Sequence, residues 1–290
     1  MRDNGAISVI DLPHGRNDLA WSVGVDADAD DPTALDRMIA GGPWNGPLIV
    51  SMPRTGSTLL GTIMLLATDP PGSDRFAFDR YVHEPVAPLF WEDEPVESIL
   101  ENTGGALRPR DIVQESAYQF ASPEIARWFL RNARQPIAFT MRHPQISWPS
   151  RWRIMLREWL ASDPDDPDAD RFRYAIDAND FSKLGDILTT RVSQPDNGWH
   201  AFLRLLNMCD EEGIEFALVD NARFRHDPDD VLSKLMRAWG LEYDDALTSW
   251  TDFEHIRPRI VMSDLALGSE YDWYYARTLG SKDGICLLYT

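Results

Sequence analysis

The chain has 290 residues, of which 43% are hydrophobic, so it can form one large domain or two small ones. Its 47 acidic and 28 basic residues give a net charge of −19, which argues against nucleic acid and anionic membranes as partners, because both need a basic surface. Two cysteines are too few for a disulfide framework or a zinc pattern. No long apolar stretch typical of a signal peptide follows the N-terminus, so we expect a cytoplasmic protein.

The first 46 residues are acidic and rich in glycine and proline. They suggest a short strand over residues 7–12 and a short helix over 33–40. We divide the chain into an N-terminal extension, residues 1–46, which packs on the domain or is partly disordered, and one domain over residues 47–290.

The sequence PLIVSMPRTGSTLL, which begins at Pro47, is typical of a strand, a tight loop and a helix. The apolar run over residues 48–52 suits a buried parallel strand. Gly56 allows a sharp turn and a close approach to a ligand. The apolar residues that follow predict a helix that continues to the Asp-Pro-Pro sequence near residue 69.

The start of this helix is an expected anion site, because its free N–H groups and positive dipole end attract an oxyanion. Arg54 adds a positive charge, and the hydroxyls of Ser57 and Thr58 can donate to phosphate oxygens. The loop is not a Walker A sequence, since no lysine follows Gly56. We therefore expect a loop for a 5′-phosphate rather than for a magnesium triphosphate.

Strands and helices alternate along the rest of the domain, which predicts an α/β fold with helices on both faces of a central parallel sheet. An acidic loop is expected over residues 163–170, and loops and short pieces over the last fifty residues. The other expected strands or extended segments are one that begins at residue 76 and ends at Pro85, 136–141 and 214–219. The expected helices are 93–100, 111–120, one from 123, one up to 161, 181–190, 199–211 and 227–239.

The sequence Pro-Arg-Thr-Gly-Ser-Thr-Leu-Leu, residues 53–60, resembles the 5′-phosphosulfate loop of the sulfotransferase family, whose members use 3′-phosphoadenosine 5′-phosphosulfate (PAPS). The resemblance implies a three-layer P-loop fold and a metal-free transfer of a sulfuryl group to a hydroxyl, less often an amine, of a small-molecule acceptor. The product would be adenosine 3′,5′-bisphosphate. The implied cofactor-binding residues of the loop are Arg54, Thr55, Gly56, Ser57, Thr58 and Leu59.

A second part of the resemblance is the family's 3′-phosphate site, an arginine at a strand end and a serine eight residues later. Arg142 and Ser150 have this spacing, and an arginine fork suits a phosphate. Because of Pro149, the helix after this strand must either begin late, near Ser147, or be kinked. Either Ser147 or Ser150 could therefore contact the phosphate. The spacing favours Ser150. The strand at residues 218–220 and the helix ending near 240 also resemble the late strand–helix unit of these enzymes.

The acceptor must lose a proton, and relatives use a histidine or a glutamate as the base. The resemblance points to Glu84, with His83 as the second choice; Glu84 could instead cap a helix or pair with an arginine. The family's C-terminal Arg-Lys-Gly loop is absent, and residues 280–284, Arg257, Arg259 or Arg277 are its candidate substitutes. The alternatives are a P-loop small-molecule kinase and a non-catalytic relative that binds a nucleotide or a partner.

Overall fold

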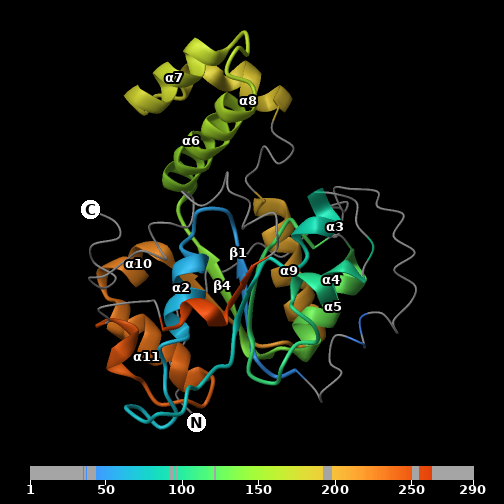
Figure 1. Ribbon diagram of the computed structural model, residues 1–290, viewed down its shortest axis with the longest axis vertical. Coiled ribbons are helices and arrows are strands. Elements are labelled where there is room, and N and C mark those ends of the chain that lie inside the picture. The colour runs from blue at the N-terminus through green and yellow to red at the C-terminus, as the bar shows by residue number, and fades with distance from the viewer. Residues whose placement is uncertain are drawn as a thin grey trace.

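A six-stranded sheet, with every strand parallel to its neighbours, forms the centre of the computed structural model (Figure 1). The structure describes residues 35, 37, 44–91, 95, 97–120, 122–191, 198–249 and 255–262. The strands occur in the order β5-β4-β1-β3-β2-β6. Their bounds are β1 Pro47–Ser51, β2 Tyr81–His83, β3 Ile112–Ser116, β4 Arg134–Met141, β5 Phe216–Asp220 and β6 Ile260–Met262.

Helices cover both faces of the sheet, because successive side chains of a strand point to opposite faces. In β1, Leu48 and Val50 pack in one core with α3, α4, α5 and α9, whereas Ile49 packs in another with α2, α10 and α11. On the first face lie α3 Ala87–Trp91, α4 Ser98–Asn102, α5 Pro123–Asn132 and α9 Trp199–Glu212. On the second lie α2 Ser57–Met64, α10 Asn221–His226 and α11 Pro228–Ala238. The expected α/β fold with three layers is confirmed.

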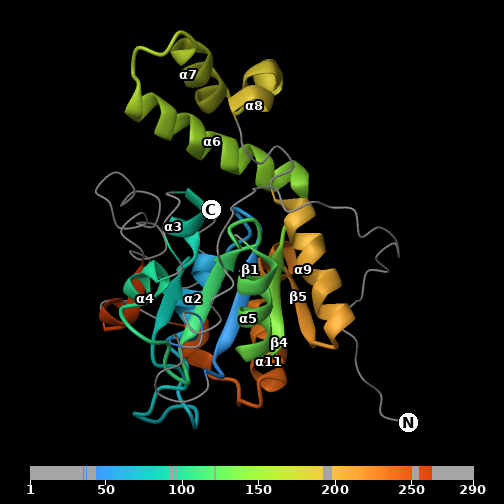
Figure 2. The same cartoon turned by 90° about the vertical axis from the view of Figure 1, so that its right-hand side faces the viewer.

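Three further helices project from the carboxyl edge of the sheet (Figures 1 and 2). They are α6 Pro144–Ser162, α7 Ala169–Ala178 and α8 Gly185–Arg191, the last preceded by the 3₁₀ turn η2 Ser182–Leu184. Leu156, Phe172 and Leu184 belong to a small core of their own. The projection is therefore a separately packed unit of the same chain. Two more 3₁₀ turns, η3 Asp245–Leu247 and η4 Arg257–Arg259, lie near the end of the described residues.

The helix expected over residues 111–120 is wrong, because residues 112–116 form the buried strand β3 between β1 and β2. Its sequence, Ile-Val-Gln-Glu-Ser, has three polar residues in a fully buried strand, so it lacks the apolar run that a central parallel strand usually shows. Asp111 does not start a helix either. Its carboxylate accepts hydrogen bonds from the backbone N–H of Arg108 and from Arg80.

Several other boundaries differ from the expected ones. The helix after β1 ends at Met64 rather than near residue 69. The second strand is confined to Tyr81–His83, within the segment expected from residue 76 to Pro85. Part of the acidic run expected as a loop belongs to α7, which begins at Ala169. The strand expected over residues 7–12 lies outside the described residues, as does most of the helix expected over 33–40.

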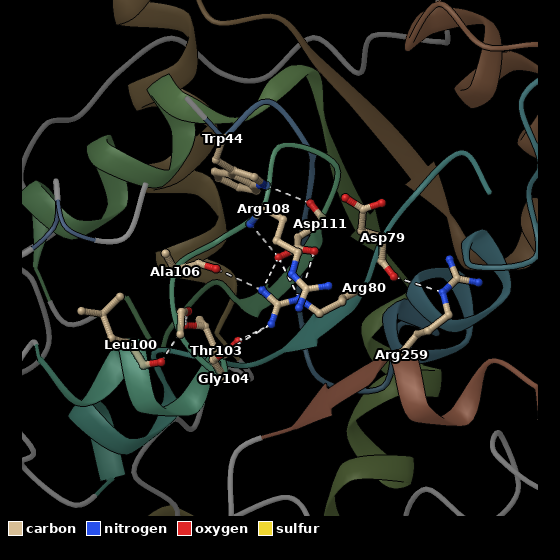
Figure 3. A network of polar contacts seen from close by, with 11 residues as sticks. Trp44, Asp79, Arg80, Leu100, Thr103, Gly104, Ala106, Arg108, Asp111 and Arg259 are labelled. Atoms are coloured by element: carbon tan, nitrogen blue, oxygen red, sulfur yellow. Dashed lines mark hydrogen bonds and ion pairs between the residues drawn. The ribbon is translucent and has the colours of Figure 1, made fainter. Parts of the chain in front are cut away.

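A buried ion pair fixes the amino edge of the sheet, opposite the carboxyl ends of the strands (Figure 3). Arg80, just before β2, donates through Nη2 to Asp111 Oδ2 at 2.5 Å, and Asp111 directly precedes β3. The same guanidinium donates to the carbonyl oxygens of Thr103 and Ala106. The indole N–H of Trp44 donates to the backbone oxygen of Asp111. Because each buried charge has partners, the network holds the chain segments that enter the two strands.

Candidate functional site

Residues 53–58, here called the anion loop, connect the carboxyl end of β1 to α2. Gly56, with φ 84°, stands at the N-cap of α2, and Arg54, with φ 67°, is a rare non-glycine residue in the left-handed region. No side chain caps α2. The N–H groups of its first turn have no partner within the helix and concentrate positive potential there. The loop therefore has the backbone geometry that a helix start needs in order to hold an anion.

The anion loop is held by the ends of two neighbouring strands. Thr55 donates its hydroxyl to Met52 O at 2.8 Å, and its Oγ1 lies 2.7 Å from Oγ1 of Thr140 on β4. Asn221, the residue after β5, donates from Nδ2 to Thr55 O at 2.8 Å. The Thr55 and Asn221 side chains are buried. The loop therefore has a fixed backbone, as an anion cradle requires.

The two predicted halves of the phosphate site meet in the structure. Arg54 Nε donates to Ser150 Oγ at 3.2 Å, and Arg142 donates from one Nη to the backbone oxygen of Arg54 at 3.3 Å. All three residues are partly exposed, whereas Ser147 is completely buried. Ser150 is thus the serine that lies against the loop arginine. A helix start near Ser147 is excluded, because α6 already begins at Pro144 and contains Pro149 in its interior.

His83 and Glu84 lie at the carboxyl end of β2, beside the start of α2. Nε2 of the buried His83 is 3.3 Å from Thr58 Oγ1. Burial lowers the pKa of His83 more than the nearby Glu84 raises it, which favours the neutral imidazole. Glu84 has φ 48°, is partly exposed, and accepts hydrogen bonds from Ser116 Oγ at 2.9 Å and Gln119 Nε2 at 3.3 Å.

Sequence reasoning missed Glu115, which lies on β3 behind Glu84. Its buried carboxylate accepts the backbone N–H groups of Val86 at 2.8 Å and Ser116 at 2.9 Å. Burial raises the pKa of Glu115, and the charge of Glu84 raises it further. Through Val86, Glu115 fixes the turn that carries Glu84. The wrong helix assignment for residues 111–120 concealed it, because a glutamate on a helix is usually on a solvated face.

One of the candidate substitutes for the missing C-terminal loop, Arg259, lies away from the site. Arg259 donates to the carbonyl oxygens of Leu65, Phe78 and Asp79 at the amino edge of the sheet, so it is not a substitute for the missing C-terminal loop. Arg277 and residues 280–284 lie outside the described residues.

Comparisons with known proteins add no family assignment: no protein-family model matches the chain, and no curated protein matches it. Within the part of the chain that the structure describes, no three His, Cys, Asp or Glu residues are grouped as metal ligands would be. None of the helices in that part combines the length and the apolar character needed to cross a bilayer. The argument for function therefore depends on the fold and on the arrangement of the site residues.

Proposed function

We propose that the chain is a sulfotransferase that moves a sulfuryl group from PAPS to a hydroxyl of a small-molecule acceptor. The observation that carries the proposal is the contact of Arg54 with both Arg142 and Ser150 at an uncapped helix start. In the sequence, Arg142 follows Arg54 by 88 positions and Ser150 follows it by 96 positions. Their meeting at one point supports a single ligand with two phosphate groups.

Each part of the site has a stated role in this proposal. Arg54 and the N–H groups of residues 55–59 hold the 5′-phosphosulfate, and Arg142 with Ser150 holds the 3′-phosphate. Negative charge grows on the 5′-phosphate as the sulfuryl group leaves, and Arg54 stabilises it there. The anion loop has no lysine in the Walker position, which favours this ligand over a magnesium triphosphate.

The chemical step needs one base. The acceptor oxygen attacks sulfur, the bond between sulfur and the bridging 5′-phosphate oxygen breaks, and the acceptor proton passes to the base. Glu84 suits this role better than His83, because its carboxylate is partly exposed and two side-chain donors orient it. His83 is 1% exposed, so an acceptor hydroxyl reaches it less easily.

Release of adenosine 3′,5′-bisphosphate from PAPS, measured with a mixture of small hydroxyl compounds and with EDTA present, tests the function. We expect turnover without magnesium, and a loss of about 100-fold or more in Glu84→Gln because a general base typically contributes that much. Unchanged turnover in both Glu84→Gln and His83→Ala would show that the base lies elsewhere.

The two alternatives give different results in the same assay. A P-loop kinase would consume ATP, would need magnesium, and would leave PAPS intact. A non-catalytic relative would bind adenosine 3′,5′-bisphosphate but would release none from PAPS with any acceptor. Either result would replace the proposed activity.

A further inference from the structure

One stripe of α6 is occupied by Ser147, Arg151, Ile154 and Glu158, whose spacings of four, three and four residues place them on the same side of the helix. The first three are buried. Arg151 lies 5.3 Å from the ring centre of Tyr118, which directly precedes the Gln119 that holds Glu84. The stripe therefore faces the carboxyl edge of the sheet, where the proposed reaction takes place.

Glu158 is the acidic residue of this stripe, and its carboxylate lacks a hydrogen-bond donor among the described residues. Its side chain is partly buried. Burial raises the pKa of Glu158 to about 7, against the weaker opposing attraction of Arg151 and Arg54. A carboxylate that is desolvated without a donor costs free energy, and such groups occur preferentially at functional sites.

The occupied site would change the electrostatics around this residue. Arg54 is one of the two cations that attract Glu158, and it is also the cation of the anion loop. A bound phosphosulfate would neutralise Arg54 and leave Glu158 with less positive charge nearby. A cation on the second substrate would restore the balance.

We propose that Glu158 binds a protonated amine on the acceptor, so that the acceptor class is hydroxylated amines. This inference rests on the proposed function. Ser150, which touches the loop arginine, precedes Glu158 by eight residues, or roughly 12 Å along the helix axis. Because helical side chains lean toward the N-terminus, the Glu158 carboxylate points back along α6 toward the end that carries Ser150. The net charge of −19 also attracts cationic ligands to the protein.

Calorimetric titration of the protein saturated with adenosine 3′,5′-bisphosphate tests the inference. The probes are two pairs in which one member carries an amine and the other is a neutral analogue: tyramine with 4-propylphenol, and hexanolamine with heptanol. We expect the amine of at least one pair to bind about tenfold or more tighter than its neutral partner, as a charge-assisted hydrogen bond allows. Glu158→Gln should reduce that preference to about twofold or less.

Glu211→Gln is the matched control, because Glu211 is exposed on α9, and it should keep the full preference. Equal binding of amines and neutral analogues, a preference that survives Glu158→Gln, or no binding of either amine would overturn the inference. Bisphosphate binding is measured first in every variant, so misfolding of Glu158→Gln would be detected. Lack of bisphosphate binding by the native protein would instead overturn the proposed function, and this inference with it.

Discussion

At the scale of single residues, side chains from distant parts of the sequence fix the anion loop. Asn221 contacts Thr55 across 166 positions, and Ser150 contacts Arg54 across 96. An anion cradle binds well only if its backbone is already in the bound conformation, since ordering it on binding would reduce affinity. The proposed function therefore gives the buried Asn221 a part in ligand binding without contact with the ligand.

Asn221→Ala should weaken the binding of adenosine 3′,5′-bisphosphate by about tenfold, because it removes the donor to Thr55 O and loosens the loop. Titration calorimetry measures the affinity. Asn132→Ala is the control: it also removes an asparagine-to-carbonyl hydrogen bond, to Trp128 O on α5, far along the chain from the anion loop. Equal affinities of the two variants would contradict the positioning role of Asn221.

Glu158 should make the protein less stable as the pH rises. Its folded-state pKa of about 7 is higher than the ordinary glutamate value of 4.5, which applies to the unfolded chain. The folded state therefore binds the proton more tightly, and the stability from this group is lost as pH rises from 4.5 through 7. Urea unfolding of the native protein and of Glu158→Gln across this range should show a smaller fall with pH in the variant. Parallel pH profiles would contradict the assigned pKa shift.

The sequence could predict the residues of the anion loop, because strand end, turn and helix start follow one another within a few positions. It could not predict Asn221, Glu115 or Glu158, since each owes its role to burial and to partners that only the folded chain brings near. Glu158 looks on the sequence like any surface glutamate in a helix. Its environment separates it from exposed carboxylates such as Glu211.

At the scale of elements, the strands with an apolar sequence were predictable and β3 was not. β1, β4 and β5 contain apolar runs, whereas β3 carries three buried polar residues. All three make specific contacts: Gln114 accepts a hydrogen bond from Tyr81, Glu115 binds the turn after β2, and Ser116 donates to Glu84. The backbone of β3 pairs as a strand, whereas its side chains are polar because they contact polar groups of neighbouring segments. A local pattern cannot reveal partners supplied by neighbouring strands.

The packing of α2 against β2 depends on Gly61. A Cβ atom at this position would lie 2.2 Å from the ring of the buried Tyr81, so Gly61→Ala must displace the helix or the ring. We expect a loss of about 1–3 kcal/mol in the free energy of unfolding, typical of overpacking. Urea denaturation measures it. Gly185→Ala, which meets nothing within 4 Å, should cost far less. Similar losses in both variants would show that α2 and β2 are not closely packed.

At the scale of the whole molecule, the strand order places the site where ligands bind in open α/β sheets. The neighbouring strands β1 and β3 continue into helices on opposite faces of the sheet, α2 and α5, which opens the carboxyl edge between them. Arg54 and Arg142 gather at this edge although the chain carries a net charge of −19. The anion loop thus has two positively charged side chains in a molecule that is negatively charged overall.

The most direct test of the central claim is calorimetric titration with adenosine 3′,5′-bisphosphate, without magnesium, of the native protein, Arg142→Ala and Arg173→Ala. Arg173 is an exposed arginine of α7 that pairs with Asp170, so it serves as the matched control. We predict binding that weakens by about tenfold or more in Arg142→Ala and is unchanged in Arg173→Ala, because only Arg142 lies at the anion loop. No binding by the native protein, or equal affinity in all three, would contradict the proposed cofactor site.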